Sequence, residues 1–376
     1  MFDPQDNVFM LPGPVKIHRR VLDAMSVPSM AHRSEHFKAV NEELRELLKY
    51  LFQTDYDVAL FSGSGTAAVE ASVSNLLRKG DKVLNLANGK FGERLNELSK
   101  VFADPTLLKF DWGKSMDLGA LEKAMASGKY RAVTLCHNET STGVTNPAKE
   151  IGQIVKKHGA FFILDGITSV GGIPVHPKEY GADVVIFGSQ KCVGAPAGLA
   201  GICVSPEALA AMYDDTSYYL NIKKHVKKLK EGDTPWTPAI PLFLAMREAL
   251  RMLKEEGIEN RLEKTRQLAE ATRAGVEALG LQLYPDPKIA SNTLTAINYP
   301  EGIKDKEFRN MLRDRYGVII AGAQDSIKGK VFRIGHMGMC SWTDLVATFG
   351  AIEATLSRMD YKFEKGASVA EIVKRM

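Results

Sequence analysis

Short apolar runs alternate with helical patterns over the first two thirds of the chain. The runs lack the polar alternation of half-exposed strands, so they predict strands buried on both faces of a largely parallel sheet. Helical periodicity is clearest over residues 66–77 and 118–125. This order of elements indicates an α/β protein. The predicted strands cover residues 57–61, 82–86, 132–136, 161–165, 184–187 and 201–204.

The pattern changes after the Pro-rich stretch at residues 234–238. A long amphipathic region from 239 to 279 is followed by shorter strand candidates at 294–297 and 331–334. A change of this kind indicates a second packed unit. We therefore predict an N-terminal arm (1–18), a large domain (19–256) and a smaller α+β C-terminal domain (257–376).

Composition and charge exclude several classes of protein. The 376 residues are 45% hydrophobic and 25% charged, and 49 Lys+Arg against 45 Asp+Glu give a net charge of only +4. This net positive charge is too small to attract nucleic acid or an anionic membrane to the protein as a whole. No apolar run approaches the ~20 residues of a membrane span, and the acidic start is unlike a signal peptide. The four cysteines are far apart and form no C-x-x-C pair, which favours reduced thiols. We expect a cytoplasmic protein with neither nucleic acid nor membrane as partner.

The first candidate site is the segment Ser-Gly-Ser-Gly-Thr-Ala-Ala at residues 62–68, between the predicted strand ending at Phe61 and the helix beginning near Thr66. Small residues let the backbone turn sharply, and the free N–H groups of a helix N-terminus attract anions. This turn is a candidate phosphate site. The alternative is a tight strand-to-helix turn without a ligand.

Residues 63–68 also fit the dinucleotide fingerprint G-x-G-x-x-A. That fingerprint requires an acidic residue at the end of the next strand. The strand that ends near Leu86 is followed by Ala87 and Asn88 instead. The sequence therefore disfavours NAD, and a non-enzymatic dinucleotide-binding module is kept as an alternative.

The second candidate site is the pair Asp165 and Lys191. Asp165 closes a predicted strand, so its carboxylate should emerge at the sheet edge where open α/β sheets bind ligands. Lys191 follows the next strand in a loop of small residues at 188–194. Lysine forms Schiff bases when its pKa is lowered, and a carboxylate on a pyridinium nitrogen accompanies such a lysine in pyridoxal phosphate enzymes. Taken singly, Asp165 would be interpreted as a helix cap and Lys191 as a solvated surface charge.

The third candidate is Arg333, inside the apolar strand at 331–334. A guanidinium in such a strand is costly unless it meets an anion, and its planar fork matches a carboxylate. Arg333 is therefore a candidate for binding substrate. The alternative is a structural ion pair with a carboxylate of the chain itself.

Several segments together resemble the class V aminotransferases of the alanine–glyoxylate and serine–pyruvate type. They are the turn at 62–68, N-E-T-S-T-G at 138–143, D-G-I-T-S-V-G-G at 165–172, G-S-Q-K at 188–191 and F-R-I-G-H-M-G at 332–338, with a similar L-P-G-P at 11–14. The resemblance implies a fold-type I enzyme that carries pyridoxal 5′-phosphate. It implies a large domain with a mostly parallel seven-stranded sheet, a small α+β domain, and a homodimer with shared active sites.

The resemblance also implies roles for single residues. Lys191 would form a Schiff base with the cofactor and then move the substrate's proton, and Asp165 would keep the pyridine nitrogen protonated. Arg333 would bind the substrate carboxylate, with Gly13 and Thr140 in the same pocket. The other cofactor contacts would be Ser64, Gly65, Thr66 and Gln190 at the phosphate, Phe91 and Ile167 on the two ring faces, Thr140 at the ring oxygen, and Thr234 and Thr237 reaching the neighbouring subunit's phosphate. Many relatives have Trp or Tyr where this chain has Phe91, and some have Tyr at the position of Thr234.

Two further patterns carry weaker hypotheses. Residues 32–36 fit the zinc pattern H-x-x-E-H, but Ser34 predicts an N-cap before a helix at 35–52, which would leave His32 outside that helix. We expect no metal, and Arg33 could instead reach a substrate side chain. The basic run at 223–230 is typical of a solvated helix face and could lie near the entrance for anionic substrates.

The predicted activity is transfer of an amino group from alanine or serine to glyoxylate or pyruvate by a ping-pong mechanism. Aspartate is the alternative donor. A cysteine desulfurase shares the implied fold, but it needs a nucleophilic cysteine ahead of the Arg333 strand. Residues 321–330 contain none, which disfavours persulfide chemistry.

Overall fold

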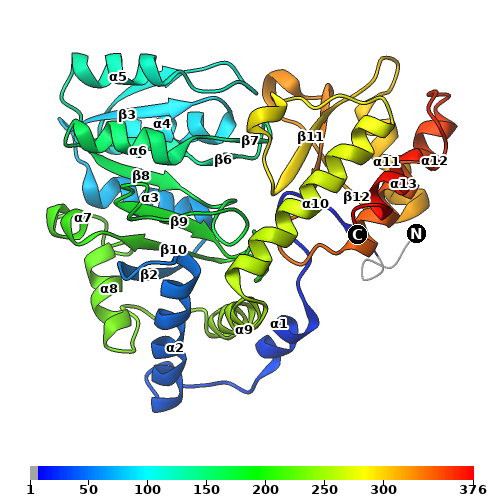
Figure 1. Cartoon of the computed structure of the whole chain (residues 1–376). Coiled ribbons are helices and arrows are strands. Elements are labelled where there is room, and N and C mark those ends of the chain that lie inside the picture. The colour runs from blue at the N-terminus through cyan, green and yellow to red at the C-terminus, as the bar shows by residue number, and fades with distance from the viewer. Residues whose placement is uncertain (1–6) are drawn as a thin grey trace.

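The computed structural model describes residues 7–376, and within them no helix is both long and apolar enough to cross a membrane. A seven-stranded sheet with the order β2-β10-β9-β8-β5-β3-β4 forms the centre of the larger part (Figure 1). Strand β10 runs antiparallel to both neighbours, and the other neighbouring pairs are parallel. The strands are β2 (Asp57–Ser62), β3 (Lys82–Ala87), β4 (Asp104–Lys109), β5 (Ala132–Cys136), β8 (Phe161–Asp165), β9 (Val184–Gly188) and β10 (Leu199–Val204).

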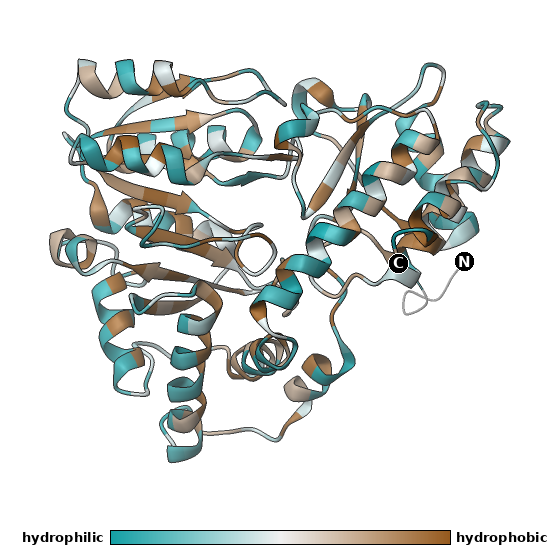
Figure 2. Ribbon diagram, in the orientation of Figure 1, coloured by the Kyte–Doolittle hydropathy of each residue, from teal (hydrophilic) through white to brown (hydrophobic). Residues whose placement is uncertain are grey.

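Helices cover both faces of this sheet. Val58 and Leu60 of β2 pack in one hydrophobic cluster, whereas Ala59 and Phe61 pack in another on the opposite face. This alternation follows from the two-residue period of a strand. Figure 2 shows apolar residues along the strands and polar residues on the outer helix surfaces. The helices of this part are α1 (Arg19–Asp23), α2 (Glu35–Phe52), α3 (Gly65–Leu76), α4 (Lys90–Phe102), α5 (Leu118–Ser127), α6 (Ala148–Lys157), α7 (Pro206–Ala211), α8 (Ile222–Lys230) and α9 (Ile240–Glu256).

A second, three-stranded antiparallel sheet has the order β11-β14-β13. Its own hydrophobic cluster includes Phe308, Phe332 and Phe349. Helix α10 begins directly after Gly257, whose φ of 85° ends α9 and redirects the chain. These features support our proposed domain boundary at residue 257. The elements are α10 (Ile258–Ala278), β11 (Leu294–Asn298), α11 (Asp305–Tyr316), β13 (Ala321–Gly322), β14 (Val331–Gly335), α12 (Trp342–Arg358) and α13 (Ala367–Val373).

Two short strand pairs complete the part of the fold that surrounds the site. Strands β6 (Asn138–Glu139) and β7 (Val144–Thr145) form a hairpin beyond the carboxyl end of β5. Strand β1 (Val8–Phe9) pairs in parallel with β12 (Val318–Ile319). The first described strand therefore lies in the part of the molecule that holds the smaller sheet, and the chain then enters the larger part (Figure 1).

Candidate active site

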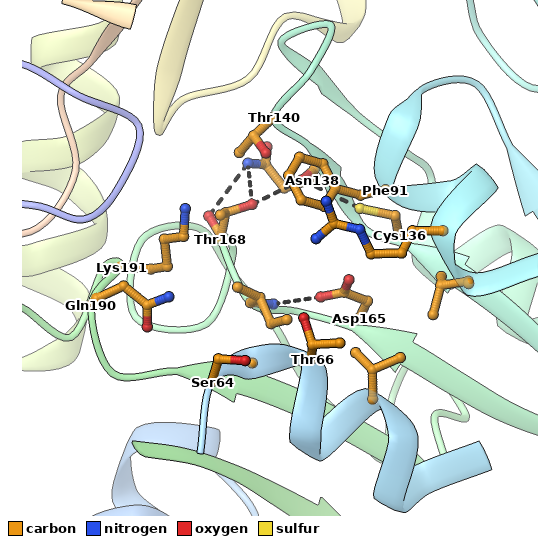
Figure 3. Close-up of a pocket in the computed structure, with 15 residues that line it drawn as sticks. Ser64, Thr66, Phe91, Cys136, Asn138, Thr140, Asp165, Thr168, Gln190 and Lys191 are labelled. Carbon is orange, nitrogen blue, oxygen red and sulfur yellow. Dashed lines mark hydrogen bonds between the residues drawn. The ribbon is translucent and has the colours of Figure 1, made fainter. Parts of the chain in front are cut away.

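A cavity of about 170 Å³ lies at the carboxyl edge of the seven-stranded sheet. In the close-up, Lys191 and Asp165 lie on opposite sides of it, and Ser64 and Thr66 lie on the helix below (Figure 3). The cavity brings together most of the site residues predicted from the sequence. These are Ser64, Gly65, Thr66, Phe91, Thr140, Asp165, Ile167, Gln190 and Lys191.

The phosphate turn predicted from the sequence is the N-terminus of α3. Ser64 is the N-cap, and its side chain makes no capping hydrogen bond, so the hydroxyl can meet a ligand. The first N–H groups of a helix have no partner within it and attract anions. A Cβ atom at Gly65 would lie 2.6 Å from Cδ1 of Ile167. The glycine is therefore required for close packing, and the turn can bind a phosphate.

Asp165 ends β8 and is only 6% exposed. Its Oδ1 accepts a hydrogen bond from the backbone N–H of Ile167 at 2.9 Å. Burial raises the pKa of the Asp165 carboxyl to about 6, although the Ile167 N–H opposes this rise. A carboxylate kept from water in this way is stabilised by a cation placed beside it.

Lys191 extends toward the N-terminal arm, and its Nζ donates a hydrogen bond to the carbonyl oxygen of Pro12 at 2.8 Å. Burial lowers the pKa of the Lys191 ammonium to about 8, which increases the share of the nucleophilic neutral amine near neutral pH. Gly13 lies beside this amine: its φ is 101°, and a Cβ atom there would come within 2.4 Å of Nζ. Any side chain at residue 13 would therefore displace Lys191.

Arg333 is buried in β14 and donates to backbone carbonyls. Its NH1 donates to the Thr140 oxygen at 2.7 Å, and Nε and NH2 donate to the Gly322 oxygen at 3.1 and 2.5 Å. Within residues 7–376 no carboxylate lies within ion-pair distance of Arg333. Burial lowers the pKa of its guanidinium to about 10. Among the described residues, Arg333 therefore does not form the structural ion pair considered from the sequence. Its guanidinium can bind an anion from outside the chain.

Thr234 and Thr237 do not line this cavity. They border a separate small pocket together with Trp236 and His225, and the Thr234 hydroxyl donates to the Trp236 carbonyl at 2.8 Å. Their expected contact with a neighbouring subunit's phosphate stays a prediction. Arg33 likewise lies outside the cavity lining and forms an ion pair with Asp233 at 2.7 Å.

Several lining residues received no role in the sequence analysis. Arg94 follows Phe91 by one helical turn, so the i, i+3 spacing could have indicated a shared face. Its guanidinium carbon lies 4.7 Å from the centre of the Phe91 ring. Asn138 and Thr168 belong to the recognised segments, but their mutual hydrogen bond joins strand β6 to the turn after β8 (Figure 3). The remaining unassigned lining residues are Val69, Leu95 and Cys136.

Glu139 binds the backbone of the helix that carries Phe91. Its Oε2 accepts hydrogen bonds from the backbone N–H groups of Phe91 and Gly92 at 3.0 and 2.9 Å, in the first turn of α4. Its Oε1 accepts from the Ser141 hydroxyl at 2.6 Å. Burial raises the pKa of this fully enclosed carboxyl, against the effect of these donors. Glu139 thus fixes the helix that presents Phe91 to the cavity.

The zinc pattern at residues 32–36 lacks the geometry of a metal site. Helix α2 begins at Glu35, and the Ser34 side chain accepts a hydrogen bond from the Phe37 N–H, as predicted for an N-cap. His32 therefore lies outside the helix that carries His36. The basic run at 223–230 lies on α8, whose apolar residues Val226 and Leu229 are buried.

The family model described as aminotransferase class-V matches residues 18–339. The chain belongs to the class V aminotransferases. An uncharacterized aminotransferase of Methanocaldococcus jannaschii is 40% identical over 99% of this chain and 98% of its own. A serine–glyoxylate aminotransferase of Methylorubrum extorquens is 35% identical over 98% of this chain and 95% of its own.

A solved structure confirms the fold of this aminotransferase. The ureidoglycine–glyoxylate aminotransferase of Bacillus subtilis superposes with a TM-score of 0.93 at 30% identity, covering 98% of this chain and 97% of the other. The architecture is that of fold-type I enzymes, as the resemblance implied. Membership in the family also decides against a non-enzymatic dinucleotide-binding module.

Class V aminotransferases use pyridoxal phosphate, and the cavity of this aminotransferase suits that cofactor. Within the described chain, the buried Oε1 of Gln190 has no hydrogen-bond partner. Gln190 lines the cavity, and its amide carries two N–H donors of the kind that bind a phosphate. The free α3 N-terminus, the buried Asp165 carboxylate and the Lys191 amine are groups of the kinds that suit the phosphate, the ring nitrogen and the aldehyde of this cofactor.

Proposed function

We propose that this aminotransferase transfers the amino group of alanine or serine to glyoxylate or pyruvate by a ping-pong mechanism. One observation carries the proposal: a single cavity is lined by Lys191, Asp165 and the free N-terminus of α3. Arg333 is hydrogen-bonded to Thr140 of the same lining. The same cavity serves both half-reactions, because the amino donor and the oxo acceptor share a carboxylate and differ at the reacting carbon.

The residues of the chain divide the work. When bound, pyridoxal phosphate supplies an aldehyde that condenses with amines and a ring that accepts electrons. Asp165 holds the ring nitrogen in its protonated form, and Lys191 takes the proton from the substrate α-carbon and returns it. Arg333 holds the substrate carboxylate, with Gly13 and Thr140 shaping the pocket. The cofactor is held by Ser64, Gly65, Thr66 and Gln190 at the phosphate, and by Phe91, Ile167 and Thr140 around the ring.

The choice of small substrates rests on the charges around the cavity. Apart from Lys191, Arg94 is the only cationic residue among the described lining residues. If aspartate were the donor, its second carboxylate would need a cation, and Arg94 is the lining residue that could provide it. The names of two relatives include glyoxylate as acceptor, which supports the same choice here. A desulfurase is disfavoured because residues 321–330, ahead of the Arg333 strand, contain no cysteine.

The proposal includes a cytoplasmic homodimer whose active sites are shared. Thr234 and Thr237 lie outside this chain's own cavity, near the exposed Tyr218 and the ring of Trp236. An exposed aromatic group of this kind is typical of a subunit interface. In that arrangement the two threonines hold the phosphate of the neighbouring subunit.

A half-reaction screen tests the assignment of substrates. The purified enzyme, loaded with cofactor, is mixed with alanine, serine, aspartate or cysteine, and the absorbance change of the bound cofactor is recorded. We expect alanine or serine to react fastest and glyoxylate or pyruvate to restore the original spectrum. Reaction with aspartate alone would replace the donor. Failure of all small amino acids, together with sulfide release from cysteine, would overturn the proposal.

A further inference from the structure

The side chain of Asn138 is buried at the border between the two sheets and uses both ends of its amide. Its Nδ2 donates to the hydroxyl oxygens of Thr168 and Thr293 at 3.0 and 2.9 Å. Its Oδ1 accepts from the hydroxyls of Ser291 and Thr145 at 2.6 and 3.0 Å. Asn138 is only 1% exposed, so no water replaces these partners freely.

The four partners belong to two different parts of the molecule. Thr145 lies in the β6–β7 hairpin, and Thr168 follows β8 at the carboxyl edge of the large sheet. Ser291 and Thr293 directly precede β11 of the small sheet. The amide of Asn138 therefore joins the β6–β7 hairpin and the turn after β8 to the segment that begins the smaller sheet.

This segment is coupled to Arg333 through the backbone. Strand β11 pairs with β14, with Ala296 opposite Arg333 in the register. The Thr293 carbonyl accepts the His336 N–H at 3.0 Å just beyond the end of β14. Arg333 in turn donates to the Thr140 oxygen, two residues from Asn138. A shift of residues 291–293 away from Asn138 would therefore move β14 and its guanidinium.

We propose that Asn138 is a positioning residue, which through Ser291 and Thr293 sets the place of Arg333 relative to Lys191. This inference rests on the proposed role of Arg333 in binding the substrate carboxylate. It gives Asn138 a part in substrate affinity. The position of Arg333 depends on the hydrogen bonds of Asn138 with Ser291 and Thr293, because these two residues precede the smaller sheet. The bonds with Thr145 and Thr168 stay within the larger part and do not reach that sheet.

The test removes single hydroxyl groups on either side of the amide. Ser291→Ala and Thr293→Val each delete a bond to Asn138 from the small sheet side. Thr145→Val is the matched control, because it deletes a bond to the same Oδ1 from the large sheet side. None of the three residues lines the cavity. The melting temperature of each variant reports its general structural cost.

The probes are 2-methylalanine, which has no α-hydrogen to lose, and isopropylamine, which lacks the carboxylate. Their binding to the holoenzyme is followed by the absorbance of the cofactor. We expect Ser291→Ala and Thr293→Val to weaken 2-methylalanine by about tenfold, the value of one well-placed hydrogen bond. Binding of isopropylamine and the cofactor spectrum should not change, and Thr145→Val should behave like the wild type with both probes.

An Arg333→Met variant separates the two ideas. If it binds 2-methylalanine as well as the wild type does, the proposed role of Arg333 is wrong. If it loses affinity while Ser291→Ala and Thr293→Val keep theirs, Arg333 binds the carboxylate without help from Asn138, and the positioning inference is overturned. Equal losses for both probes, or an equal loss in Thr145→Val, would also overturn it, because the effect would then be general.

Discussion

The carboxyl group of Asp165 is enclosed at the end of β8, and burial raises its pKa from 3.8 to about 6. The folded, cofactor-free protein therefore holds this proton more tightly than the unfolded chain does, so its stability falls as the pH rises from about 4 to 6. A shift of this size corresponds to about 3 kcal/mol. We predict that Asp165→Asn makes the cofactor-free protein more stable by about that amount at pH 7.5 and by about half of it at pH 5.

Denaturant unfolding of the cofactor-free proteins at the two pH values measures this difference. Asp183→Asn serves as the control, because Asp183 is equally buried but is satisfied by Lys156 Nζ, Ser205 and the Phe162 N–H. That variant should lose stability at both pH values. If Asp165→Asn were less stable than the wild type at pH 7.5, burial of the charged Asp165 carboxylate would not be what lowers the stability of the cofactor-free protein.

The proximity of Asp165 and Lys191 could be predicted from the sequence. Asp165 ends one strand and Lys191 follows the next, and the sheet brings strand ends to one edge, where both residues line the cavity. The partners of Arg333 could not be predicted, because the Gly322 and Thr140 carbonyls are backbone atoms placed by tertiary packing. The proximity of Arg94 to Phe91 depends on where the N-terminus of α4 lies.

Helix α4 is the element that carries Phe91, and its start is fixed by the carboxylate of Glu139. Replacing Glu139 with Gln keeps the shape but turns one acceptor oxygen into a donor that faces N–H groups. A buried group left unsatisfied costs about 1–3 kcal/mol. We predict a loss of unfolding free energy of this size and weaker cofactor binding, measured by chemical unfolding and by titration of the cofactor-free protein.

Glu93→Gln provides the comparison on the same helix. Glu93 is partly exposed and contacts Lys109 and the Trp112 ring N–H, so its loss should cost about 1 kcal/mol or less and leave cofactor affinity unchanged. Equal cofactor affinity in both variants would mean that α4 keeps Phe91 in place without Glu139.

Elements with a strong apolar signal were predicted within a few residues, whereas β4 was not predicted. Strand β4 (Asp104–Lys109) pairs with β3 alone, contains Pro105 and is largely exposed, so it lacks the pattern of a buried strand. The amphipathic region from 239 to 279 forms two helices because Gly257 interrupts it with a positive φ.

In the whole molecule, the N-terminal arm connects both parts to the site. The Met10 carbonyl accepts a hydrogen bond from the Gly335 N–H at 2.8 Å. The Pro12 carbonyl accepts one from the Lys191 amine, and the Val15 N–H donates to the Gln190 carbonyl at 3.0 Å. These pairings are far apart in the sequence and carry no local pattern, so the contacts of the arm could not be predicted from the sequence. Through Pro12 the arm contacts Lys191, and through Val15 it contacts Gln190, two residues that line the cavity.

The proposed sharing of sites between two subunits has a consequence for mixed dimers. Lys191→Ala removes the reacting amine, and Thr237→Glu places a negative charge where the proposal puts the neighbouring phosphate, so each homodimer should be inactive. In a dimer of one Lys191→Ala and one Thr237→Glu chain, one site combines both changes and the other has none. Random mixing gives half mixed dimers, so about a quarter of the wild-type activity should return. Unfolding and refolding the variants together, with each alone as control, measures this. No recovery in a mixture proven to contain mixed dimers would place Lys191 and Thr237 in the same site of one chain.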